Sequence, residues 1–145
     1  MYEISNDPGR LDVGRIHRFL STEAYWSPGV PRDVVERSIA NSLPFGVYSQ
    51  ESGEQVGFAR VVTDYATFAW IADVYVEAAH RGHGLGKRLV AEILEHPDLQ
   101  GLRRWLLGTA DAHELYRRFG FDELDRVERF MAIETGAAAR QCSGD

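Results

Sequence analysis

The first candidate for chemistry is the segment of residues 80–89, which reads HRGHGLGKRL. Three glycines alternate with other residues, and Lys87, the only lysine of the chain, follows them directly. Glycines at this density allow positive φ angles and leave backbone amides uncovered, which is how a loop wraps an anionic group. Because a predicted strand precedes the loop and a predicted helix follows it, a helix dipole adds to those amides. The segment therefore predicts a site for a small anion, with a tight turn that binds nothing as the alternative.

Two common phosphate loops do not fit this spacing. A P-loop requires Gly, four residues, Gly, Lys and then Ser or Thr, whereas Gly82 and Gly86 are one residue too close and Arg88 follows Lys87. A dinucleotide loop would need its third glycine at Lys87, after a first parallel strand. The sequence thus argues against both a magnesium-nucleotide loop and a dinucleotide loop.

Composition limits the kind of protein. The 145 residues with 44% hydrophobic content predict one domain, residues 1–134, followed by a disordered tail, residues 135–145. Because the chain has no long apolar run and no signal-peptide pattern, we expect a cytoplasmic protein without a membrane partner. The net charge of −6 argues against nucleic acid, since neutralising phosphates requires a broad basic surface.

Cysteine and metal chemistry are not indicated. The single cysteine, Cys142, excludes an internal disulfide and, in a polar tail, is a poor nucleophile. No cluster with metal-ligand spacing is found, so we expect no metal.

The elements that must position the loop follow from hydrophobic periodicity and turn residues. Short turns between β-type runs make those runs antiparallel neighbours. The pattern predicts an α+β fold, with about four helices flanking a mostly antiparallel, mixed sheet of six to seven strands. The predicted helices are residues 11–20, 33–42, 85–96 and 110–120, and the predicted strands are residues 2–5, 45–50, 56–64, 67–76, 103–108 and 130–133.

Two segments resemble the GNAT superfamily of N-acyltransferases. VYVEAAHRGHGLGKRLV, residues 74–90, is similar to the acetyl-CoA signature, with Arg81, Gly84 and Gly86 at the matching positions. LYRRFGF, residues 115–121, resembles the second hallmark, a tyrosine followed by a Gly-Phe pair after a short helix. The order of elements fits from residue 2 to residue 133, nearly the whole chain.

The resemblance implies acetyl-CoA as co-substrate. Amides of the loop would hold its pyrophosphate, and a splay between the fourth and fifth strands would let the pantetheine arm pair with a strand edge. Thr109 stands where many relatives have Asn, and its hydroxyl can still form a hydrogen bond. The implied cofactor-binding residues are Val74, Tyr75, Val76, Arg81, Gly82, His83, Gly84, Leu85, Gly86, Lys87 and Thr109.

The resemblance also implies the catalytic residues. Tyr116 matches the general acid, a phenol that protonates or hydrogen-bonds the leaving thiolate. Several relatives place Glu then Asp on the fourth strand, where this chain has Ala72 and Asp73, so Asp73 is the leading candidate for the base. His113, one helical turn before Tyr116, and a water-mediated route are the alternatives.

Four residues are candidates for contact with the acceptor. Tyr25 and Trp26 lie between the first two predicted helices, in the segment that covers the acceptor pocket in this superfamily. Asp64 ends a strand near the expected acceptor side, and His113 is a substrate contact if it is not the base. Acidic residues in the pocket would favour a cationic amine.

These observations predict transfer of an acetyl group from acetyl-CoA to a primary amine of a small molecule or peptide, by direct attack. A non-catalytic module that senses acyl-CoA is the alternative, and a purely structural domain leaves the glycine loop without a purpose. The superfamily often dimerises, so a homodimer is also an expectation.

Overall fold

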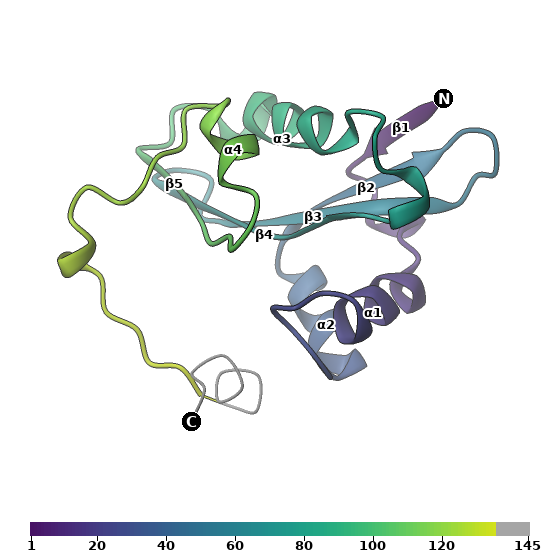
Figure 1. Ribbon diagram of the computed structural model, residues 1–145, viewed down its shortest axis with the longest axis horizontal. Helices are drawn as coiled ribbons and strands as arrows, with labels where there is room; N and C mark the ends of the chain where they lie inside the picture. Colours follow the sequence, from purple (N-terminus) through teal and green to yellow (C-terminus); the bar gives the residue numbers. More distant parts are fainter. Residues whose placement is uncertain (136–145) are drawn as a thin grey trace.

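The computed structural model describes residues 1–135 and shows an α+β fold (Figure 1). Of the predicted tail, residues 135–145, only residue 135 is described. Cys142 lies outside the described residues. Within them, no helix combines the length and apolarity needed to cross a bilayer. The main elements are β1 (Tyr2–Ser5), α1 (Val13–Thr22), α2 (Arg32–Ala40), β2 (Leu43–Ser49), β3 (Gln55–Thr63), β4 (Phe68–Val76), α3 (Leu85–Glu95), β5 (Arg104–Leu107) and α4 (His113–Arg117).

The sheet has five strands in the order β1-β2-β3-β4-β5. The first three pairs are antiparallel and β4 pairs with β5 in parallel, so the sheet is mixed and mostly antiparallel as predicted. The prediction of six to seven strands is wrong for residues 1–135. Residues 130–133 have the composition of a strand, but they follow a short 3-10 helix, η4 (Val127–Arg129), and pair with no strand in this part of the chain. A strand needs a neighbour for its backbone hydrogen bonds, and local composition does not supply one.

Helices cover both faces of the sheet (Figure 1). Leu85, Leu89 and Ile93 recur every four residues, so α3 buries one apolar stripe against one face. On the opposite face, α1 buries Ile16 and Phe19 against Phe58 and Tyr75 of the sheet. The fold thus presents β4 between two helical layers, with α1 on one side and α3 on the other.

The sheet opens at the carboxyl end of β4. Pairing between β4 and β5 ends at Ile71 and Leu107, although β4 continues to Val76. Within residues 1–135, the last five residues of β4 therefore have no strand on their β5 side. This is the splay that the resemblance implies, and it leaves a strand edge open to a ligand.

Candidate active site

The glycine loop wraps the amino end of α3 with its amides exposed. Gly82 has φ +87°, and Gly84, the residue that caps α3, has φ +74°, so both positions need the left-handed backbone that glycine adopts freely. Within residues 1–135, the backbone amides of residues 82–87 donate no hydrogen bond to another protein group. These donors converge at the positive end of an eleven-residue helix, which is the arrangement that binds phosphate.

A groove of about 600 Å³ runs from this loop along the open edge of β4. A Cβ atom on Gly86 would lie 3.7 Å from Leu115 Cδ2, so a larger side chain there would fill part of the groove. Leu85, although part of the loop, is mostly buried in the core. The predicted cofactor residues that line the groove are Val74, Tyr75, Val76, Arg81, Gly82, Gly84, Leu85, Gly86 and Lys87. The groove therefore fits a long ligand with an anionic group at the loop and an extended arm along β4.

Two predicted cofactor residues are placed elsewhere. His83 does not line the groove, and its ring Nδ1 lies 3.1 Å from the carbonyl oxygen of His80. Thr109 lines a second hollow instead, and its hydroxyl accepts a hydrogen bond from the amide of Ala112 over 3.0 Å. Thr109 therefore caps the turn before α4, while Arg81 folds its Nε atom onto the carbonyl oxygen of Val76 at 2.8 Å.

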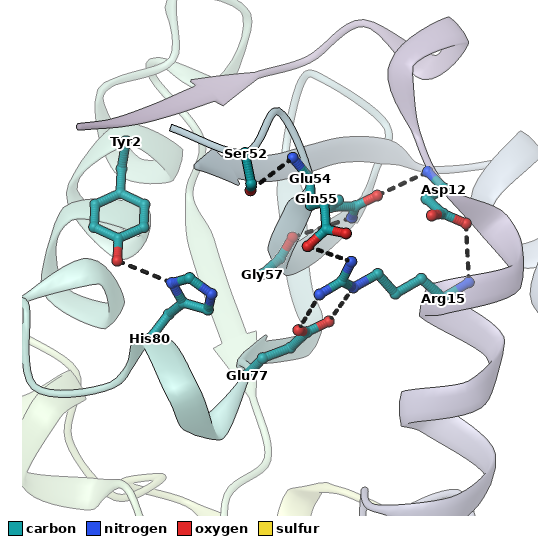
Figure 2. A network of polar contacts seen from close by, with 9 residues as sticks. All are labelled: Tyr2, Asp12, Arg15, Ser52, Glu54, Gln55, Gly57, Glu77 and His80. Atoms are coloured by element: carbon teal, nitrogen blue, oxygen red, sulfur yellow. Dashed lines mark hydrogen bonds and ion pairs between the residues drawn. The ribbon is translucent and has the colours of Figure 1, made fainter. Parts of the chain in front are cut away.

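A polar network holds the entry to the glycine loop (Figure 2). Glu77, directly after β4, accepts hydrogen bonds from Nε and a terminal nitrogen of Arg15 on α1, both over 2.6 Å. The two side chains are about one fifth exposed, so this two-pronged pair is partly shielded from water. His80 contacts the hydroxyl of Tyr2 through Nδ1 at 2.9 Å. The loop is thus anchored to α1 and β1 at its start.

Tyr116 lies where the groove meets the second hollow. Its position on α4 is fixed by the turn that follows, because Gly120 adopts φ +97° and brings the Phe121 ring into edge contact with the Tyr116 ring, with 5.8 Å between centroids. Burial, followed by the nearby Tyr25 and the negative charge of Asp111, raises the pKa of Tyr116 to about 12. The phenol therefore remains protonated at neutral pH and can donate a hydrogen bond.

The second hollow has a volume of about 810 Å³. It is lined by Tyr25 and Trp26 from the segment between α1 and α2, here called the lid. The Tyr25 hydroxyl accepts a hydrogen bond from the amide of Ala110 over 2.9 Å, which ties the lid to the turn before α4. The Tyr25 and Trp26 rings meet edge to face, and both line the hollow. We call this hollow the acceptor pocket.

Asp73 lies at an irregularity of β4. One residue of β3, Ala59, faces both Asp73 and Val74, and Asp73 adopts φ +55°, which is unfavourable for a residue other than glycine. Its Oδ1 atom accepts from Trp26 Nε1 over 2.8 Å, and its Oδ2 atom accepts from Arg60 Nε over 2.7 Å. Both carboxylate oxygens are therefore engaged, which favours an orienting role for Asp73 over removal of a proton.

Two predicted acceptor contacts do not reach the pocket. Asp64 accepts hydrogen bonds from the Thr67 hydroxyl and from the amides of Thr67, Ala66 and Phe68, and these bonds hold the pKa of its carboxyl well below the usual range. It closes the turn between β3 and β4. His113 is exposed at the start of α4 and lines a different hollow, behind β5. The structure thus separates both residues from the acceptor pocket.

The pocket also contains residues that the sequence analysis missed. Arg60, a lone charge in the apolar run of β3, pairs with Asp73 and donates to the Ser42 hydroxyl over 3.2 Å. Asp111 lines both the groove and the acceptor pocket, and within residues 1–135 its carboxylate makes no hydrogen bond or ion pair. Its position five residues before Tyr116 was the only available signal. Trp70 and Glu134 also line the acceptor pocket.

Comparison with known proteins identifies the family. The profile of the acetyltransferase (GNAT) family matches residues 8–121. A Gibberella zeae protein whose name assigns it to the acetyltransferases is 35% identical, over 79% of this chain and 75% of its own length. A crystal structure from Xanthomonas campestris, described as belonging to the GNAT family, is 45% identical, with a TM-score of 0.90 over 93% of this chain and 94% of its own.

A more distant structure shares the fold alone. The enzyme AAC(6')-Iy is 17% identical, with a TM-score of 0.67 over 94% of this chain and 99% of its own, and it was solved with a bisubstrate analogue, CoA-S-monomethyl-acetylneamine. Members of the GNAT family transfer an acetyl group from acetyl-CoA to an amine acceptor. By its glycine loop, its splayed sheet and its family match, this chain belongs to the GNAT family of acetyltransferases.

Proposed function

We propose that this enzyme acetylates a primary amine of a small molecule or peptide by direct attack on acetyl-CoA. The observation that carries the proposal is the position of Tyr116, a buried phenol at the junction of the loop groove and the acceptor pocket. A donor bound in the groove and an amine bound in the pocket would meet at this residue. Holding two reactants together in this way converts a bimolecular step into an effectively unimolecular one.

The loop amides and Lys87 would hold the pyrophosphate, and the open edge of β4 would pair with the pantetheine arm. Bound acetyl-CoA supplies a thioester carbonyl as the electrophile. In the reaction the amine nitrogen forms a bond to the carbonyl carbon, the carbon–sulfur bond breaks with its electron pair remaining on sulfur, and the amine loses one proton. The products are an N-acetyl amide and the free thiol.

Tyr116 would donate a hydrogen bond from its hydroxyl to the developing thiolate. A pKa of about 12 lies above the usual value of a thiol, about 8.5, so a hydrogen bond is favoured over complete proton transfer. The proton that finally appears on sulfur can come from the amine. Tyr116 therefore acts at the leaving group, where its hydrogen bond stabilises the negative charge that develops on sulfur.

A carboxylate at the junction would take the amine proton, directly or through water. Asp73 is the candidate that the sequence suggests, but Arg60 and Trp26 already occupy both of its oxygens. Asp111 lines both hollows without a partner among residues 1–135. We therefore assign removal of the amine proton to Asp111. Asp73 instead orients the lid and the amine.

The charge of the acceptor pocket supports a cationic amine as substrate. Asp111 and Glu134 line it, while Arg60 and Asp73 neutralise one another. The aromatic faces of Trp26 and Trp70 can pack against the carbon skeleton of the acceptor or against its charge.

The test is release of free thiol from acetyl-CoA by the purified protein across a panel of amines, peptides and neutral controls. We expect amine-dependent release with stoichiometric N-acetyl product, fastest with dicationic amines. Equal slow release with every compound, together with tight acetyl-CoA binding, would show a sensing module instead of a transferase.

A further inference from the structure

An apolar row crosses β3, β4 and β5 on the sheet face that carries α1 and α2. Val62 of β3 lies opposite Trp70 of β4, and Trp70 in turn lies opposite Leu106 of β5, so the three share one face. Phe58, which α1 covers, is four residues before Val62, and alternation along β3 places both on that same face. We call Val62, Trp70 and Leu106 the apolar row.

The two helices of this face do not cover the apolar row. Within residues 1–135, the core cluster that α1 and α2 form with the sheet includes Phe58 but neither Val62 nor Trp70. Val62 and Trp70 are each 38% exposed, and Leu106 is only partly buried. In Figure 1, α1 and α2 lie under the middle and right of the sheet, and no described α-helix lies under its end at β5. Adjacent exposed apolar side chains of this kind mark an interaction surface.

The apolar row borders the acceptor pocket. Trp70 belongs to both, and the end of its ring reaches Gly108 of the pocket wall, where a Cβ atom would meet Trp70 Cη2 at 3.8 Å. The neighbouring row of the same face, two residues away along β3 and β4, consists of Arg60 and Ala72, and both line the pocket. The two rows are about 6.5 Å apart, because a strand rises about 3.3 Å per residue. An amine held in the pocket therefore has an apolar surface one row away.

The spacing and the charge of this surface fit a peptide that carries a lysine. Alternate side chains of an extended peptide point to the same side about 6.5 Å apart, which matches the separation of the two rows. A lysine stem can enter the pocket while the peptide backbone stays on the sheet face, and Asp111 and Glu134 in the pocket attract its ammonium group. A small amine would fill the pocket and leave the apolar row uncovered.

We propose that the acceptor is a lysine of a peptide segment, and that the apolar row binds a large aliphatic side chain two positions from that lysine. This inference rests on the proposed function, because it places the lysine nitrogen in the acceptor pocket. Packing of the aliphatic side chain against Val62 and Trp70 removes apolar surface of both partners from water. The pocket thus recognises the amine, while the apolar row selects among lysines by their neighbours.

Matched peptides test the selection by steady-state rates of acetyl transfer. Each peptide has one lysine and carries a leucine two positions before it, two positions after it or directly beside it, and a serine peptide has no leucine. We expect leucine at one of the two alternate positions to raise kcat/KM about tenfold over the serine peptide. Leucine directly beside the lysine points to the opposite side and should bring no gain. Equal gains at all positions would contradict the proposed geometry.

Val62 allows the row to be changed without changing the pocket, because it is not among the residues that line the pocket. We expect Val62→Asp to abolish the leucine preference and to leave kcat/KM for the serine peptide and for a small amine unchanged. Val62→Thr keeps the β-branched shape that suits a strand and should lower the preference as well. Val34→Asp, at a 43% exposed position on α2, is the matched control and should keep the preference. Circular dichroism checks that each variant folds.

Calorimetry with the same peptides separates this inference from the proposed function, because it measures binding without transfer. Tighter binding of the alternate-leucine peptide by the wild type, lost in Val62→Asp, supports the inference even if no peptide is acetylated. If neither binding nor rates show a leucine preference, the inference is overturned, even where a small amine is acetylated. A preference that survives in Val62→Asp and Val62→Thr overturns it as well. A molar mass that changes in Val62→Asp without a change in preference would identify a second copy as the occupant of the row.

Discussion

The indole Nε1 of Trp26 donates to Asp73 Oδ1 over 2.8 Å, so the lid of the acceptor pocket is fastened to the irregular residue of β4. Arg60 binds the other oxygen of the same carboxylate over 2.7 Å. One side chain with an unfavourable backbone angle therefore connects the lid, β3 and β4. Different substitutions of Asp73 can therefore distinguish its contribution to stability from its contribution to catalysis.

We expect Asp73→Ala to lower the free energy of unfolding by about 1–3 kcal/mol, because it leaves the Arg60 and Trp26 donors without their acceptor. Asp73→Asn should cost less, since asparagine tolerates a positive φ and keeps one oxygen. Denaturation by urea measures both. Unchanged stability of Asp73→Ala would show that the carboxylate contacts add nothing to stability.

Proton removal should depend on Asp111. We expect Asp111→Asn to remove the acidic limb of the pH profile of kcat, whereas Asp73→Asn should keep that limb and raise KM for the amine. The reason is that both Asp73 oxygens already accept hydrogen bonds. If Asp73→Asn loses the limb and Asp111→Asn keeps it, the base is Asp73.

Removal of the Tyr116 hydroxyl should slow the chemical step. We expect Tyr116→Phe to lower kcat about a hundredfold, with little change in KM for acetyl-CoA. Because burial raises the pKa of Tyr116 to about 12, its ionisation should not limit the wild-type rate at neutral or mildly alkaline pH. Steady-state rates of thiol release measure this, and an unchanged kcat would remove Tyr116 from the mechanism.

Gly84, one of the two loop glycines with positive φ, allows a matched comparison. Gly84 and Gly101 have φ of +74° and +78°, and a Cβ at either would meet no atom within 4 Å. Valine at each position should therefore strain the backbone alike, by about 1–3 kcal/mol. Only Gly84→Val should weaken acetyl-CoA binding, by at least tenfold in calorimetry, because Gly101 lies in the turn before β5. Equal affinities for the two variants would contradict the assignment of the loop.

Asp64 should contribute to folding and not to catalysis. Its carboxyl has a lowered pKa in the folded state, so the stability it provides is present above the unfolded value, near 3.8, and is lost as pH falls through the lower folded value. Asp64→Asn should therefore lower Tm at pH 7, and the difference from the wild type should shrink in acid. KM and kcat should not change, and a raised KM for the amine would return Asp64 to the acceptor site.

Local features of the site could be predicted from the sequence. The loop between β4 and α3 follows from the spacing of Gly82, Gly84 and Gly86 and from the apolar stripe of the helix, because all of these contacts are close in sequence. Tyr25 and Trp26, expected to cover the acceptor because they lie between two helices, line the hollow that we propose as the acceptor pocket.

Contacts between distant segments could not be predicted in this way. Trp26 and Asp73 are 47 residues apart, so nothing in either segment indicates that they meet. Asp64 was expected at the acceptor side because it ends a strand, but the residues after it offer four donors within one turn and satisfy it locally. Residues 130–133 show the same limit, since a strand-like composition does not determine which edge it joins.

The position of α1 has a thermodynamic consequence. Near the amino end of α1, Arg15 pairs with Glu77 at the entry to the glycine loop. The carboxyl end of α1 leads into the lid, where Trp26 donates to Asp73 beside the acceptor pocket. One ten-residue helix is therefore connected to both of the proposed substrate sites, directly at the loop and through the lid at the pocket. If binding in the groove shifts this helix and thereby changes the affinity of the pocket, linkage requires that the acceptor alter the affinity for the donor by the same factor.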